Sequence, residues 1–292
     1  MIFVVLAFLG LAAGSFVNAL VWRLRQQELK AESLKLKAGK KELLAGDFQL
    51  SAGKDLSIFT GRSQCPHCRH TLTWHELIPL LSWLLLRGHC RYCGKPISWQ
   101  YPIVELATAA VFLVSYSFWP GGVFGVGDWV LLITWLAASV GLIALLIYDL
   151  KWMLLPNKIL FPALFVAVAG RLIYLLSFEP DKAQAAAAWA LSVAVASGLF
   201  WLIFTVSAGK WIGYGDVRLG LITGTILADP VLSLLMIFVA SVLGTLVTLP
   251  ALTTGRKHID SHIPFGPFLI TATTIVLLLG QTFIDFYNRL LE

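Results

Sequence analysis

Two aspartates stand at the ends of long apolar stretches, where an ionisable side chain is costly and is usually kept for pairing or function. Asp149 directly follows the uncharged run WVLLITWLAASVGLIALLIY, and Asp216 lies in GYGDVRLG (213–220), shortly after another apolar run ends. Two carboxylates a few ångströms apart cannot both ionise easily, so one pKa rises and the pair holds a single proton near neutral pH. Such a pair can hydrolyse a peptide bond, because one carboxylate takes a proton from the attacking water while the other protonates the carbonyl oxygen.

Gly213 and Gly215 stand close to the second aspartate. Glycine has no Cβ, so it permits unusual backbone angles and lets an extended substrate chain approach closely. We therefore predict that these glycines position the substrate. Taken alone, each aspartate is better explained as a helix cap or as a polar residue at the membrane interface, since Asp is common at helix starts. The pair, at equal predicted depth, favours the catalytic interpretation.

Four cysteines, the only ones in the chain, form two C-x2-C pairs separated by 21 residues: Cys65 and Cys68, then Cys90 and Cys93. Each pair offers two thiolates from one tight turn, which suits a tetrahedral structural zinc ion. Two disulfides are the alternative, but the topology described below puts the segment in a reducing compartment. A thioredoxin-like redox motif would need one such pair in a βαβ setting, which the sequence lacks. Spare ligand candidates nearby are His67, His70, His75 and His89.

The composition predicts an all-α polytopic membrane protein. The chain is 58% hydrophobic and 13% charged, about half the charged share of a soluble domain. About 20 apolar residues cross a bilayer as a helix. Stretches of this kind are Ile2–Trp22, Pro102–Trp119, Trp129–Tyr148, Ile159–Ser177, Ala183–Ala208, Val231–Leu252 and Phe265–Phe286. The shorter run Leu219–Leu227 is counted as a half-length or partly submerged helix, so we predict about eight transmembrane helices in total.

The basic residues predict how these helices are oriented. Arg23 and Arg25 follow the first apolar run instead of preceding it, so we predict a retained helix with its N-terminus outside, not a signal peptide. In an alternating model 19 of the 22 Lys and Arg residues lie on one side, which the positive-inside rule identifies as the cytoplasm. Both aspartates then lie at the cytoplasmic face. The net charge of +6 reflects this orientation, and the sequence carries no nucleic-acid-binding signature.

The sequence of the first cytoplasmic loop predicts that this loop contains a small separate module. Residues 26–64 are polar and charged, suited to a linker helix or to a basic helix on anionic lipid. The cysteine segment follows, and ELIPLLSWLLL (76–86) between the pairs is too short to span, so we expect it against the bilayer surface. We therefore divide the chain into residues 1–100, the first helix with a cytoplasmic zinc module, and residues 101–292, a transmembrane peptidase core.

Together the motifs resemble the bacterial type IV prepilin peptidases, also called leader peptidase/N-methyltransferases, a family of GxGD-type membrane aspartic proteases. The similar segments are GSFVNALVWRL (14–24), the cysteine block (65–110), DLKWMLLPN (149–157), GYGDVRLG (213–220) and PFGP (264–267). The resemblance implies an inner-membrane enzyme that removes the leader of prepilins and pseudopilins at the cytoplasmic face, then methylates the new N-terminal amine with S-adenosylmethionine. It maps the catalytic aspartates onto Asp149 and Asp216 and the zinc ligands onto the four cysteines.

The methyltransferase half rests on resemblance alone, because the sequence has no Gly-rich loop of a soluble methyltransferase. Our candidates for cofactor or amine contact are Glu76 and Gly88, between the cysteine pairs. The alternatives are that Glu76 faces solvent and that Gly88 forms the turn before Cys90. Arg218 stands where the family usually has lysine, and its role is open because the two cations differ in donor geometry.

Other protein classes share some of these features. Tyr148–Asp149, GYGD and the Pro-Ala-Leu at 250–252 mimic the motif order of signal-peptide peptidases and presenilins, but that family lacks the double cysteine pair. A zinc-stabilised transporter would place its aspartates near the midplane between inverted repeats, and we find no internal repeat. A zinc protease would need H-E-x-x-H, which is absent from the chain.

Overall fold

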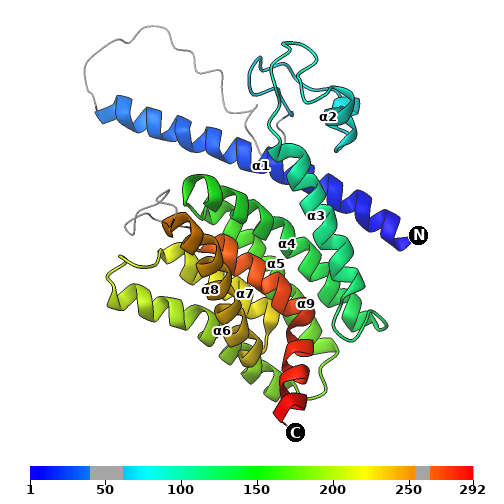
Figure 1. Cartoon of the computed structure of the whole chain (residues 1–292), viewed down its shortest axis with the longest axis vertical. Helices are drawn as coiled ribbons and strands as arrows, with labels where there is room; N and C mark the ends of the chain where they lie inside the picture. Colours follow the sequence, from blue (N-terminus) through cyan, green and yellow to red (C-terminus); the bar gives the residue numbers. More distant parts are fainter. Residues whose placement is uncertain (40–61, 254–263, 292) are drawn as a thin grey trace. The chain divides into compact units, whose positions relative to one another are not determined.

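A computed structural model describes residues 1–39, 62–253 and 264–291 of the chain. Regular structure in these ranges is helical, apart from two isolated β-bridges, which confirms the predicted all-α class. The elements are α1 (Ile2–Gly39), η1 (Trp74–Leu77), α2 (Leu81–Leu85), α3 (Gln100–Ser117), α4 (Val126–Trp152), α5 (Asn157–Ser177), α6 (Lys182–Val206), α7 (Tyr214–Leu227), α8 (Pro230–Thr253) and α9 (Gly266–Leu291). Figure 1 shows them along the chain.

The chain divides into two compact units, Met1–Phe112 and Leu113–Glu292. The division falls inside α3, later in the chain than the boundary at residue 100 that the sequence analysis placed. The first unit holds α1, the cysteine segment and most of α3, and the second holds α4 to α9. The assignment of separate functions to two domains stays a prediction.

Small residues let α1 and α3 pack closely inside the first unit. A Cβ placed on Gly10 would lie 2.5 Å from the Cα atom of Ala109, and one placed on Gly14 would lie 2.6 Å from the Cα atom of Glu105. Such close approach is typical of helix packing in membranes. Helix α1 continues past the apolar run to Gly39, so the start of the polar insert is helical. The rest of that insert, residues 40–61, lies outside the described ranges.

In the described part of the second unit the chain forms six helices, α4 to α9 (Figure 1). Most of their buried side chains are apolar. Helices α4 and α5 approach closely where Gly141 faces Ala163, since a Cβ on this glycine would lie 2.8 Å from the alanine Cβ. Fully buried leucines, Leu142 and Leu145 of α4 and Leu160 of α5, belong to the core of the unit. The dense core fixes the end of α4, where Asp149 lies.

Helix α7 is held against α6 by serines and glycines. Ser197 Oγ donates to the Val217 carbonyl at 2.9 Å, and Ser192 Oγ donates to the Gly224 carbonyl at 2.8 Å. A Cβ on Gly220 would lie 2.6 Å from the Ala196 carbonyl oxygen, so only glycine fits there. These contacts fix the helix whose first turn carries Asp216.

Among the described residues, six helices are long and apolar enough to cross a membrane. They are α1 over Ile2–Ser33, α4, α5, α6, α8 over Pro230–Pro250, and α9 over Gly266–Leu290. The other two predicted spans are helices too, but α7 has only 14 residues and α3 carries the polar Gln100 and Glu105 in its first two turns. Large apolar side chains such as Phe165 and Phe238 are exposed, as expected of helices facing lipid. A multi-pass membrane protein is thus confirmed, and the count of eight spans stays a prediction.

Candidate functional site

Asp149 lies near the end of α4, where the chain turns toward α5. Its side chain is buried, with 5% of the residue exposed. Its carboxylate accepts a hydrogen bond from the backbone N–H of Gly266, the first residue of α9. The first N–H groups of a helix have no partner within the helix, and the helix dipole favours negative charge there. The start of α9 therefore supplies the polar environment that this buried carboxylate needs.

Asp216 lies in the first turn of α7 and is 9% exposed. Its carboxylate accepts a hydrogen bond from the backbone N–H of Gly213, the residue that caps this helix. An acid in this position is the reciprocal half of a capping box. The negative charge of Asp149 acts on Asp216, so the structure brings together the two aspartates that the sequence analysis paired.

The two glycines near Asp216 serve other purposes than the backbone freedom that we predicted. Gly213 has φ −75° and ψ 147°, a conformation that any residue adopts. Gly215 is tightly packed, since a Cβ there would lie 2.9 Å from a methyl carbon of Leu155. The missing side chain at Gly215 thus lets the α4–α5 connection lie against α7. Whether either glycine contacts a substrate stays a prediction.

Arg218 links the start of α7 to the start of α5. Its guanidinium donates to the side-chain oxygen of Asn157 and lies over the ring of Tyr214, 4.5 Å from the ring centroid. The ring contact uses the planar face of the guanidinium, which the ammonium of a lysine does not have. Arg218 therefore braces the turn that carries Asp216, a structural role that the sequence left open.

Both carboxylates are buried and accept a backbone N–H. Within the described part of the chain, no basic side chain bonds to either of them. Such a pair can exchange protons with a substrate. One carboxylate can act as a general base toward water while the other acts as a general acid. Burial of the pair strengthens their mutual effect, because the dielectric constant inside the protein is lower than in water. The arrangement suits hydrolysis by acid–base chemistry.

The four cysteines form one cluster in the first unit. Cys65 Sγ and Cys93 Sγ lie 4.0 Å apart, as do Cys68 Sγ and Cys90 Sγ, and all four sulfur atoms lie within 4.8 Å of one another. The thiols are free. Sulfur atoms at about 2.3 Å from a central zinc ion would be about 3.8 Å apart. The cluster thus fits a tetrahedral metal ion.

Each cysteine pair closes a similar turn. The N–H of Arg69 donates to the Cys65 carbonyl, and the N–H of Gly94 donates to the Cys90 carbonyl, both at 2.9 Å. Arg69 and Gly94 are both in the left-handed region, with φ 57° and 66°. Within the residues that the structure describes, no histidine joins the cluster. His70 instead stacks on Tyr92, and His89 bonds the Arg87 carbonyl.

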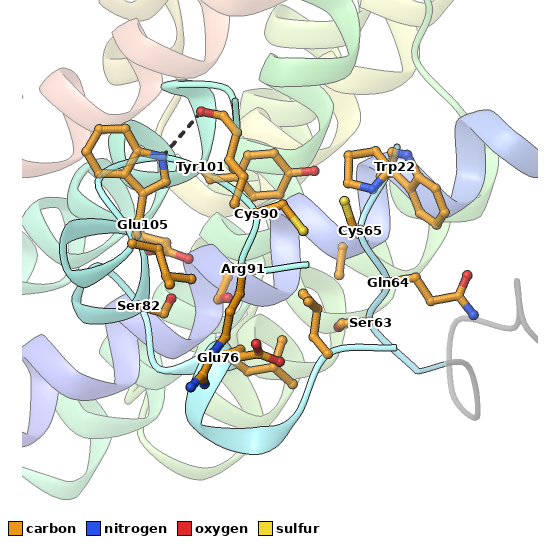
Figure 2. Close-up of a pocket in the computed structure, with 18 of the residues that line it drawn as sticks. Trp22, Ser63, Gln64, Cys65, Glu76, Ser82, Cys90, Arg91, Tyr101 and Glu105 are labelled. Atoms are coloured by element: carbon orange, nitrogen blue, oxygen red, sulfur yellow. Dashed lines mark hydrogen bonds between the residues drawn. The ribbon is translucent and has the colours of Figure 1, made fainter. Parts of the chain in front are cut away.

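A cavity lies beside the cysteine cluster in the first unit, and Figure 2 shows it with Cys65, Cys90, Glu76 and Glu105 around it. Its walls include the aromatic side chains of Trp22, Trp83 and Tyr101, and Arg23 and Arg91 also contribute. Trp83 is held by a hydrogen bond from its Nε1 to the Ile97 carbonyl at 3.4 Å and by the ring of Trp99 at 4.3 Å. The cavity thus combines fixed rings with charged groups of both signs.

Glu76 is the buried acid of this cavity, with 9% of the residue exposed. Its Oε2 accepts from the backbone N–H of Thr73 at 2.9 Å, from the Thr73 hydroxyl at 2.8 Å and from the Tyr92 hydroxyl at 3.4 Å. The Thr73 backbone hydrogen bond holds the pKa of Glu76 below its usual range. Glu76 is therefore a carboxylate at neutral pH. The alternative that Glu76 faces solvent is wrong, because the residue is buried.

Gly88 does not line the cavity but supports one of its walls. Its φ is 70°, and a Cβ there would lie 2.9 Å from the Trp83 ring. The sequence interpretation of Gly88 as a turn residue before Cys90 agrees with this geometry. A direct contact of Gly88 with a cofactor stays a prediction, and its contact in the structure is with Trp83.

Sequence reasoning missed Gly266 at these sites, and it singled out Glu105 as a pocket or interface residue without identifying its hydrogen-bond partner. Gly266 belongs to the PFGP motif, but nothing in the sequence pairs it with Asp149, because the contact joins distant parts of the chain. Glu105 accepts the Leu80 N–H at 2.7 Å and thereby fixes a residue with φ 60°. A charged residue among apolar ones was the only sign of its role. By contrast, T-x-x-E at 73–76 is a readable capping-box pattern.

Two family models match the chain. Residues 8–119 match the bacterial peptidase A24 N-terminal domain, and residues 136–249 match the type IV leader peptidase family. The first match contains the cysteine cluster and the cavity, and the second contains both aspartates.

Similar proteins cover nearly the whole chain. A prepilin leader peptidase/N-methyltransferase of Aeromonas hydrophila is 33% identical over 283 residues, which cover 95% of this chain and 91% of the relative. The protein of the same name in Bacillus subtilis is 35% identical over 256 residues, 85% of this chain and 95% of the relative. The protein of the same name in Pseudomonas aeruginosa is 32% identical over 276 residues, which cover 94% of this chain and 89% of the relative. No solved structure matches the chain.

Proposed function

Because this chain belongs to the type IV leader peptidase family, we propose that Asp149 and Asp216 are the catalytic pair that cleaves the leader from type IV prepilins. The protein is a prepilin leader peptidase/N-methyltransferase, and it is a bacterial multi-pass membrane protein. Pseudopilins of secretion systems are proposed as further substrates, since they carry the same kind of leader. The lipid bilayer is proposed as its other partner.

One observation carries the catalytic assignment: two buried carboxylates, from separate helices, are near enough for the charge of one to act on the other. In the reaction, one carboxylate accepts a proton from water as the water oxygen attacks the peptide carbonyl carbon. The other donates a proton to the carbonyl oxygen. Gly213 and Gly215 lie within three residues before Asp216, and we assign the backbone around them to positioning the extended substrate.

The active site is proposed to face the cytoplasm, with the N-terminus outside and eight helices in the inner membrane. This orientation is supported by the basic residues, of which 19 of 22 fall on one side of that model. The exposed side chains of Leu81, Leu84 and Leu85 support contact of α2 with the bilayer surface.

The cysteine cluster is proposed to hold a structural zinc ion through Cys65, Cys68, Cys90 and Cys93. The sulfur spacing and the paired turns support this proposal. A structural site uses four protein ligands and keeps no open position for water, which these cysteines satisfy without a histidine. The ion would join the two turns across the base of the cavity, since Cys65 and Cys90 line it.

S-adenosylmethionine is proposed as the methyl donor, with the first unit as its site. When bound, it supplies an activated methyl group for the new N-terminal amine. The aromatic walls of the cavity suit an adenine ring, and Glu76 and Glu105 suit positive charge. Gly88 contributes indirectly, because it leaves room for the Trp83 ring.

The test is mass spectrometry of a co-expressed prepilin, which reads leader removal and the added methyl mass together. Asp149→Asn and Asp216→Asn each keep the side-chain volume but remove the acid, so we expect cleavage to be lost in both. Asp181→Asn is the matched control, because Asp181 caps α6 through the Gln184 N–H at 3.0 Å and Asn caps equally well. Full cleavage by either purified active-site variant would refute the pair.

A further inference from the structure

Glu76 leaves one oxygen atom unexplained. Its Oε2 has three hydrogen-bond donors, two from Thr73 and one from Tyr92. Its Oε1 is buried and has no hydrogen-bond partner within the described residues. A buried acceptor without a donor costs about 1–3 kcal/mol, and more when it is charged. The capping role of Glu76 therefore accounts for half of its carboxylate and leaves the other half without a partner.

The unpartnered oxygen belongs to a residue that lines the cavity of Figure 2. Two other charged groups of this cavity are hydrogen-bonded or exposed. Glu105 Oε2 accepts the Leu80 N–H at 2.7 Å, and Arg91 is exposed to solvent. The group of this cavity that lacks a partner is therefore Glu76 Oε1, a hydrogen-bond acceptor that carries negative charge. Its natural partner is a cation with N–H groups.

The proposed methyl transfer brings two kinds of cation to this cavity, a sulfonium and a primary ammonium. The positive sulfur of a sulfonium has no N–H, so it cannot satisfy Oε1. A primary ammonium has three donors on a compact charge, and its hydrogen bonds to a carboxylate are among the strong ones. Both reaction partners carry such a group: the new N-terminus of the cleaved pilin, and the amino acid part of the methyl donor.

We propose that Glu76 Oε1 is the binding site for a primary α-ammonium group in the cavity beside the cysteine cluster. This inference rests on the proposed methyl transfer. The Thr73 hydrogen bonds to Oε2 fix the carboxylate, so Oε1 is held in one orientation before the ligand arrives. Glu76 is then a binding residue of the methyltransferase site, and the aromatic walls enclose the apolar part of the same ligand.

The test measures binding of two ligand pairs to the full-length protein in detergent. The first pair is S-adenosylhomocysteine and its analogue that lacks only the amino group. The second is a peptide of a mature pilin N-terminus with a free amine and the same peptide acetylated. Glu76→Gln can keep the bonds to Thr73 through its amide oxygen but places an uncharged NH2 at the position of Oε1. We expect it to weaken one ammonium-bearing ligand by about 10- to 100-fold and to leave its matched partner unchanged.

The pair that responds identifies the source of the ammonium. Loss confined to S-adenosylhomocysteine assigns Oε1 to the donor, and loss confined to the free peptide assigns it to the acceptor. Unchanged binding in both pairs overturns the proposal. Equal weakening of the ammonium-bearing ligand and its matched partner also overturns it, because that result shows a structural role alone.

Two further variants keep the test interpretable. Tyr92→Phe removes a donor to Oε2 and leaves Oε1 untouched, so both pairs should change by less than about threefold. Glu76→Asp keeps the charge and withdraws the carboxylate by one methylene, and it replaces Glu76→Gln if the latter loses zinc or unfolds. Leader cleavage measured on the same preparations reports the proposed aspartate pair separately, so failure of one proposal is distinguishable from failure of the other.

Discussion

The contact between Gly266 and Asp149 makes a sharp prediction for the substitution Gly266→Ala. A Cβ on residue 266 would lie 2.5 Å from Asp149 Oδ2, whereas ordinary contact begins at 3.4 Å. The carboxylate, or the start of α9, must therefore move by about 0.9 Å. Either movement lengthens the hydrogen bond from the Gly266 N–H and shifts Asp149 relative to Asp216.

The expected loss follows from the size of this shift. A displacement of about 1 Å in a catalytic group costs about 100-fold in rate, equivalent to about 2.7 kcal/mol of transition-state stabilisation. The substitution adds one methyl group at the start of a helix and removes no charge. We therefore expect kcat for leader cleavage to fall about 100-fold while KM changes by less than about threefold.

The assay is single-turnover cleavage of a purified prepilin by enzyme in detergent, followed by mass spectrometry. Gly198→Ala is the matched control, because Gly198 lies inside α6 and a Cβ there meets no atom within 4 Å. This control should cleave at the wild-type rate and be as stable or slightly more stable. A wild-type rate for Gly266→Ala, at an unchanged melting temperature, would show that Asp149 does not need the position seen here.

Three further substitutions test other parts of the structure. Gly220→Val should lower stability by about 1–3 kcal/mol through overpacking against α6, seen as a lower melting temperature in detergent. Gly88→Ala should reduce methylation more than cleavage, because φ 70° and the Trp83 ring both oppose a side chain; equal loss of both activities would contradict this. Cys93→Ser should remove zinc, measured by metal analysis, and harm methylation or stability more than cleavage; unchanged methylation would count against a role for the cluster.

The sequence predicts local features of this protein well. The C-x2-C pairs predict the cysteine cluster, because two ligands from each tight turn need little help from the rest of the fold. The positions of Asp149 and Asp216 follow from where apolar runs end, whereas their common depth, which is inferred from the alternation of helices, stays a prediction. These inferences depend on spacing within a few residues or on the thickness of the bilayer, which sets the length of a spanning helix.

Features that depend on packing between helices could not be predicted. The Gly266 contact with Asp149 and the unpartnered Oε1 of Glu76 arise only when distant segments meet. Gly215 was assigned a conformational role, whereas its missing side chain makes room for Leu155. The predicted span at Pro102–Trp119 is a helix, but Glu105 is drawn into the packing with α1 and the Leu80 turn. Hydropathy alone does not distinguish a polar residue that packs against other helices from one that faces lipid.

The serine and glycine contacts between α6 and α7 have a consequence for how a bulky substrate enters. They tie the backbone of α7 to its neighbour at Val217 and Gly224, on either side of Gly220. The backbone of α7 that carries Asp216 is therefore tied to α6, whereas the Asp149 carboxylate relies on one N–H at the start of α9. We therefore expect a substrate chain that enters between the two carboxylates to displace the start of α9 before it displaces α7.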